Sequence, residues 1–289
     1  MNDFVIITDA TCDLPEDVVM ENQLVVIPMG YTMDGEEYKG TPDNKLNAKD
    51  FYNKVRAGSL PKTAQITPDE YSRCFEGYLQ QGKDVLYLAF SSALSGSCSN
   101  AFLCMQELQE KYPENKIYVV DSRGASLGEG LLVWYAAQMK KDGANIEEIK
   151  QWAEENRDHL CHYFTVDDLN HLHRGGRVSK AAAVFGTMLG VKPVLHVDNE
   201  GRLIPVAKVR GRKQSLHALV DKMEQLQGSY KNEIVFVSHG DCIQDAQYTA
   251  DLVKQRFGIQ RFIINDIGPV IGSHSGPGTV ALFFLGEQK

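Results

Sequence analysis

The feature that most constrains the fold is an alternation of short apolar runs with amphipathic stretches across the first half of the chain. The apolar runs, rich in β-branched residues, are Phe4–Ile7, Leu24–Ile27, Val85–Phe90 and Ile117–Val120. Runs of this kind are typical of strands covered on both faces. A helix face between the last two is predicted by the spacing of Ala101, Cys104, Met105, Leu108 and Tyr112. The pattern predicts a first α/β domain, residues 1–160, built as a parallel three-layer sandwich.

The second half of the chain has a different order of elements. Lys192–Val197 and Leu203–Val209 flank a turn at Gly201, which predicts a hairpin. A helix is expected from about Arg212 to Gln227. Three further strands are expected at Ile234–Val237, Phe262–Ile264 and Val280–Leu285. A second α/β domain, residues 161–289, is therefore predicted to hold a mixed sheet with helices mainly on one face.

Local signals predict where several helices begin. Thr67-Pro68-Asp69-Glu70 places proline at a first helical position. Asn145 with Glu148, and Ser126 with Glu129, have the form of capping boxes. The segment 31–40 is expected to be a small turn-rich excursion.

Composition excludes several classes of protein. Of 289 residues, 30 are Lys or Arg and 38 are Asp or Glu, so the net charge of −8 argues against general nucleic-acid binding. No apolar stretch approaches the roughly 18 residues of a membrane span, so no stable membrane insertion is expected. The N-terminus does not resemble a signal peptide, and the six cysteines form no C-x-x-C pair, which favours the cytoplasm.

Two small-residue loops follow apolar runs and are set far apart, at residues 91–97 and 271–278. Each collects hydroxyls, glycines and backbone N–H groups. Such loops hold an anion well where a helix N-terminus presents unpaired N–H donors. The two loops are predicted to form opposite sides of one small-molecule site.

Individual residues in these loops have both structural and functional interpretations. Ser95 would serve as an ordinary N-cap, and its flanking residues do not form the G-x-S-x-G nucleophile elbow. His274 would either donate a hydrogen bond to an oxyanion or be purely structural. From the sequence alone, Thr63 is only slightly favoured as a site residue over an ordinary surface-loop residue. Arg174 and Arg177 flank Gly175-Gly176, where guanidinium groups suit a carboxylate or phosphate. His171 and His173 give only a weak metal signal, and no metal site is predicted.

Five stretches, taken together and in order, resemble the DegV family, the fatty-acid-binding proteins that serve bacterial fatty acid kinase. They are residues 8–15 (TDATCDLP), 62–65 (KTAQ), 92–96 (SALSG), 175–179 (GGRVS) and 272–278 (GSHSGPG).

The resemblance implies two α/β domains with a lipid site between them. It implies that Thr63, Ser95, Gly96 and His274 bind the carboxylate of a long-chain fatty acid. It further implies that Arg174, and more weakly Arg210, engage a separate ATP-dependent kinase that makes an acyl phosphate. On this hypothesis the chain is a lipid-binding subunit and not itself an enzyme. The fatty acid is its ligand, and it needs no cofactor. The sequence carries no G-x-x-x-x-G-K-[ST] motif for a nucleotide.

Two alternatives remain open at this stage. A serine hydrolase or esterase would use Ser95 as nucleophile and His274 as base, and needs an acid for which Asp121 and Asp266 are the candidates. A carrier for another anion, such as a phosphosugar, would use the same loops without a lipid tail.

Overall fold

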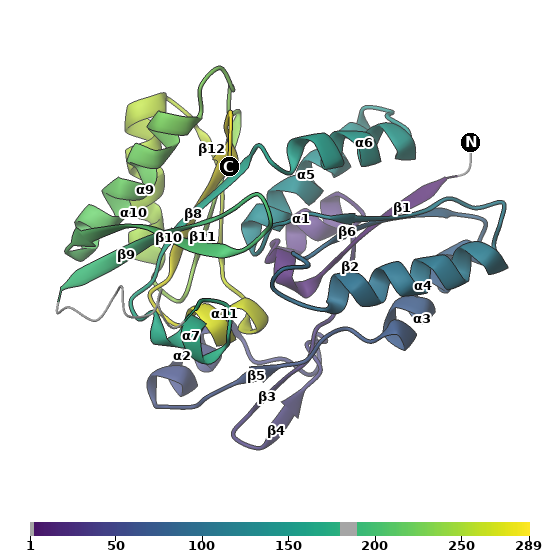
Figure 1. The fold of residues 1–289 in the computed structure, drawn as a ribbon, viewed down its shortest axis with the longest axis horizontal. Coiled ribbons are helices and arrows are strands. Elements are labelled where there is room, and N and C mark those ends of the chain that lie inside the picture. The colour runs from purple at the N-terminus through teal and green to yellow at the C-terminus, as the bar shows by residue number, and fades with distance from the viewer. Residues whose placement is uncertain (1–2, 180–189) are drawn as a thin grey trace.

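The computed structural model describes residues 3–179 and 190–289, and two sheets lie side by side in it (Figure 1). The first sheet has the order β2-β1-β6-β7, with all neighbours parallel. Its strands are β1 (Phe4–Asp9), β2 (Val25–Ile27), β6 (Asp84–Ala89) and β7 (Ile117–Asp121). Alternate residues of β1 enter different apolar clusters, because Phe4 and Ile6 face one side of the sheet and Val5 and Ile7 face the other.

Helices cover both faces of this sheet. On one face lie α3 (Pro68–Leu79) and α4 (Ser97–Lys111). On the other lie α1 (Glu16–Glu21), α5 (Leu127–Lys141) and α6 (Ile146–Asn156), with the short 3₁₀ turn η1 (Ala10–Cys12) nearby. The predicted three-layer parallel sandwich is thereby confirmed.

The second sheet has six strands in the order β10-β9-β8-β13-β11-β12. Only β11 and β12 pair in parallel, and every other neighbouring pair is antiparallel. The strands are β8 (Leu160–Thr165), β9 (Val191–Val197), β10 (Leu203–Arg210), β11 (Ile234–His239), β12 (Arg261–Asp266) and β13 (Val280–Leu285). Helices α9 (Arg212–Leu226) and α10 (Ile243–Phe257) pack on one face, which confirms the predicted mixed sheet and its hairpin.

The other face of the second sheet turns toward the first half of the chain. Phe164, Phe236 and Phe283 on this face belong to the same apolar cluster as residues of α5. Helix α5 packs against β8, β11 and β13 as well as against β1 and β6. The layer between the two sheets is therefore where a buried cavity can form.

A third, small sheet was missed by the sequence analysis. The segment expected to be a turn-rich excursion contains a hairpin of β3 (Tyr31–Met33) and β4 (Glu36–Tyr38), which adds β5 (Lys62–Thr63) as a third strand. These strands are too short to give a periodic signal. They lie near α2 (Ala48–Arg56), α7 (Asn170–Arg174) and α11 (Pro269–Ser275) (Figure 1).

The predicted helix starts had mixed outcomes. Pro68 begins α3 as predicted, and Thr67 also forms a capping box with Glu70 that was not predicted. Asn145 forms the predicted capping box with Glu148. The box at Ser126 was wrong, because Ser126 has φ +54° and its hydroxyl donates to Asp13. The Glu129 carboxylate turns away from the helix end and accepts hydrogen bonds from two threonine hydroxyls of the first sheet region.

Within residues 3–179 and 190–289, no helix has the length and apolar character needed to cross a membrane.

Candidate functional site

A cavity of about 730 Å³, including its mouth, lies between the two sheets. Its walls are mainly apolar and come from the loops after β6 and β7, from one face of the second sheet and from α11. The apolar lining residues include Met29, Phe90, Leu94, Phe164, Leu172, Val197, Leu203, Ile267, Val270, Ile271, Ala281 and Phe283.

The polar end of the cavity brings together three predicted residues. Thr63 Oγ1 lies 2.9 Å from His274 Nε2, although the two residues are 211 positions apart in the chain. Ser95 lines the same cavity. Thr63 is held there because β5 pairs with β3, and Ser95 because the chain turns from β6 into α4. The Ser95 Oγ accepts a hydrogen bond from the Ser97 N–H at 3.2 Å, which gives it part of the expected capping role.

The second loop does not have the expected form. Residues 269–275 form helix α11, begun by Pro269, and His274 lies in its last turn. A helix C-terminus carries partial negative charge, so the N-terminal dipole argument fails for this loop. Only the first loop opens a helix, with Gly96 at the N-cap of α4.

His274 is largely buried and neutral. Burial, followed by the nearby Arg177 charge, lowers the pKa of His274 to about 4. Its Nδ1 has no hydrogen-bond partner among the described residues. A Cβ at Gly175 would lie 2.2 Å from that nitrogen, so only glycine lets the α7 end approach the ring so closely.

Arg177 was named with Arg174 as a guanidinium suited to an anion but was not assigned to the carboxylate site, and the structure places it in the cavity wall. It lines the cavity beside His274, and its Nε donates to the Leu94 carbonyl at 3.1 Å. Its NH1 donates to the Gly175 carbonyl. Burial lowers the pKa of Arg177, which nevertheless stays charged at neutral pH. The Gly175-Gly176-Arg177 sequence was the available signal for it.

The other predicted residues lie outside the cavity wall. Gly96 follows Ser95 but packs against the Gln65 side chain, which its Cβ would meet at 2.6 Å. Arg174 is exposed and lines a second, outer pocket that shares Thr63, Arg177 and His274 with the cavity. Arg210 is exposed at the end of β10, paired with Val191, and lines neither pocket.

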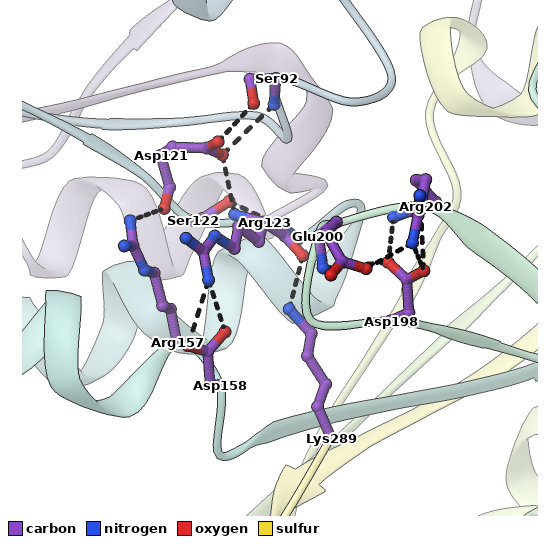
Figure 2. A network of polar contacts seen from close by, with 11 residues as sticks. Ser92, Asp121, Ser122, Arg123, Arg157, Asp158, Asp198, Glu200, Arg202 and Lys289 are labelled. Carbon is purple, nitrogen blue, oxygen red and sulfur yellow. Dashed lines mark hydrogen bonds and ion pairs between the residues drawn. The ribbon is translucent and has the colours of Figure 1, made fainter.

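A hydrolytic triad is not assembled at Ser95 and His274. Figure 2 shows Asp121 held in a separate polar network, where its carboxylate accepts from the Ser92 hydroxyl at 2.5 Å and the Arg123 N–H at 2.9 Å. Asp266 lies 3.2 Å from His239 Nδ1 instead. His274 therefore lacks an orienting carboxylate among the described residues, and neither acid proposed for the hydrolase reaches it.

The described residues hold no cluster of His, Cys, Asp or Glu side chains suited to a metal ion. All six cysteines are free thiols. The chemistry available at the polar end is hydrogen bonding from hydroxyls and imidazole, together with one guanidinium charge. This set suits a carboxylate attached to an apolar body.

Comparisons with known proteins point to one family, whose solved members include fatty-acid-binding proteins. A family model described as "Uncharacterised protein, DegV family" matches residues 3–287. A DegV domain-containing protein of Clostridium perfringens is 46% identical over all 289 residues, covering 99% of that protein. A DegV family protein from Thermus thermophilus, whose structure is described by fatty acid binding, is 28% identical with a TM-score of 0.85, covering 98% of this chain and 99% of that one. DegV from Bacillus subtilis, described as a fatty acid binding protein, is 28% identical with a TM-score of 0.84, covering 99% and 100%.

Proposed function

The chain belongs to the DegV family, and from that premise we propose that it binds a long-chain fatty acid in the cavity between its two sheets. The carboxylate would lie against Thr63, Ser95 and His274, and the acyl tail would fill the apolar part. The observation that carries the proposal is the Thr63–His274 pair, 2.9 Å apart, at the polar end of a cavity with mainly apolar walls. A phosphosugar carrier would need polar groups along those walls.

Charge balance favours an anion at this end. Arg177 is half-buried beside His274 and forms no ion pair with a carboxylate in the described parts of the chain. The unpartnered His274 Nδ1 and the Thr63 and Ser95 hydroxyls add hydrogen-bonding groups that suit a carboxylate. Burying the ligand charge is then compensated by one cation and several hydrogen bonds.

The tail supplies most of the affinity. Burial of methylene groups contributes about 0.8 kcal/mol each, so a tail of about fourteen would give roughly 11 kcal/mol as an upper bound. Charge-assisted hydrogen bonds add about 1.5–3 kcal/mol each before desolvation. The polar residues would therefore orient the head group and select an acid over an alcohol or an ester.

We further propose that the protein catalyses no reaction alone and presents the carboxylate, in the cytoplasm, to a separate ATP-dependent fatty acid kinase that forms an acyl phosphate. The outer pocket supports this, because it connects the head-group residues Thr63 and His274 to the exposed side chain of Arg174. Arg174 is the first candidate for contact with the kinase, and Arg210 is a weaker one.

Mass spectrometry of lipid extracted from the natively purified full chain tests the binding proposal. We expect a co-purifying long-chain fatty acid, and binding of added palmitate after the lipid is stripped. The proposal is overturned if no fatty acid co-purifies and the stripped protein does not bind added palmitate. Labelling of Ser95 by a fluorophosphonate would instead support a hydrolase.

The kinase proposal has its own test. Arg174→Ala should retain palmitate binding and lose phosphorylation of the bound acid by the added kinase. Arg73→Ala is a matched control, because Arg73 is an exposed arginine of α3 whose partner among residues 3–179 and 190–289 is Asp69 of the same helix. If Arg174→Ala loses palmitate binding and phosphorylation equally, or if it retains both, Arg174 does not serve as a kinase contact.

A further inference from the structure

One buried histidine in the cavity has no role in the proposed head-group site. His162 is 1% exposed, lies on β8 and lines the same cavity as the proposed fatty acid tail. Its Nε2 faces the backbone of Gly124 and Gly128, and its Nδ1 has no hydrogen-bond partner among the described residues. A buried polar group without a partner is costly, so a ligand group that supplies the partner gains affinity there.

The position of the ring is fixed by its neighbours. His162 pairs with Phe283 of β13, and the two rings meet edge to face with centroids 5.4 Å apart. On another side, a Cβ at Gly128 would lie 1.7 Å from His162 Cδ2. The first turn of α5 can therefore pack this closely against the ring only because residue 128 is glycine. The ring thus lies between apolar side chains and backbone, and no charged group of the described residues forms a hydrogen bond with it.

The register of β8 and β13 places His162 further from α11 than Thr165 is. Thr165 pairs with Val280, which follows the cavity residue Thr279, and Thr279 Oγ1 donates to the Ser275 carbonyl in the α11 region. His162 is three residues back along β8, a separation of about 10 Å at ~3.3 Å per residue. A fatty acid anchored at Thr63 and His274 would pass His162 with the middle of its chain.

We propose that His162 forms a second polar subsite in this cavity, which binds a hydroxyl group carried at mid-chain by the fatty acid. The inference rests on the proposed function, because it needs the carboxylate at Thr63 and His274. A hydroxyl group can either donate a hydrogen bond to Nδ1 or accept one from it, so it suits either tautomer of the neutral imidazole. Burial holds the pKa of His162 well below its ordinary value, so a neutral ligand group suits it better than a second carboxylate.

Two other polar residues of the wall do not serve this purpose. Ser126 Oγ lies 2.5 Å from Asp13 Oδ2 and 3.0 Å from Ser238 Oγ. Their hydrogen bonds are already made within the protein. Ser238 is therefore a matched control, since it is a polar cavity residue whose hydrogen-bonding needs are met without ligand.

The test is a competition binding assay on the lipid-stripped full chain with stearate and hydroxystearates whose hydroxyl lies beside the carboxylate, at mid-chain or at the tail end. We expect the wild type to bind the mid-chain isomer at least as tightly as stearate, and the other two isomers more weakly. His162→Leu should weaken the mid-chain isomer about tenfold, which is the value of one buried hydrogen bond, and leave stearate within about twofold. His162→Gln should restore much of the loss, and Ser238→Ala should not reproduce it.

The possible failures are distinguishable. If stearate itself does not bind, the proposed function fails. If stearate binds and the mid-chain isomer is about tenfold weaker in the wild type, the subsite does not exist and the proposed function stands. Equal losses for stearate and the mid-chain isomer in both His162 variants would make the residue purely structural.

Discussion

Protonation of His274 should weaken the folded protein at acidic pH by a calculable amount. Its pKa falls from an ordinary 6.5 to about 4 in the folded state, chiefly because burial disfavours the charged imidazole. The unfolded chain therefore binds more protons between these two pH values. Stability due to neutral His274 is fully present above pH 6.5 and is lost as the pH falls toward 4. The difference of about 2.5 pKa units corresponds to roughly 3 kcal/mol at most.

Urea unfolding of the lipid-free protein at pH 7 and pH 4 measures this loss. Other groups titrate in the same range, so the quantity of interest is the difference between the wild type and His274→Gln, whose amide can still pair with Thr63. The wild type should lose up to about 3 kcal/mol more than the variant over this range. Bound palmitate should raise the pKa of His274, visible in an NMR titration, because a carboxylate then lies beside the ring. Identical losses in both proteins would refute the burial argument.

Three further predictions concern residues around this site. Thr63→Val should weaken palmitate about ten- to a hundredfold in a competition assay and weaken the corresponding alcohol less, because a charge-assisted hydrogen bond is worth about 1.5–3 kcal/mol; equal losses would contradict head-group selection. Gly175→Ala should displace His274 and weaken palmitate, whereas Gly77→Ala, in open space on α3, should leave binding unchanged in the same assay. Burial raises the pKa of Asp13 to about 7, so wild-type stability is lost as pH rises from about 4 through 7; Asp13→Asn should become progressively more stable than the wild type over that range in urea melts, and a constant difference would argue against a protonated Asp13.

The elements best predicted from sequence were those with a long or strongly alternating apolar pattern. The strands at Val85 and Ile117 and the helix between them follow from periodicity alone, because each has two buried faces or one continuous apolar face. Strands β3, β4 and β5 were not predicted, since two or three residues cannot show a period. Yet β5 carries Thr63, so one residue of the proposed site lies on a strand that the local sequence pattern does not reveal.

The site was anticipated unevenly for a similar reason. Ser95 and His274 lie in glycine- and serine-rich segments that stand out in the sequence. His162, in contrast, lies in the middle of a mostly apolar strand, and no local pattern marks it. Its register with Phe283 and its place in the cavity wall come from the structure. The Ser126 prediction failed because a tertiary contact with Asp13 outweighed the local capping pattern.

The pairing of Thr63 with His274 has a consequence for when the protein becomes competent. His274 is synthesised 211 residues after Thr63. A nascent chain whose first sheet is complete therefore contains Thr63 but not its partner His274. On the proposed function, we expect lipid to be captured only after α11 has been synthesised and has docked beside β5. A chain that stops upstream of α11 would lack both His274 and β13, the strand that lies between β8 and β11 in the second sheet.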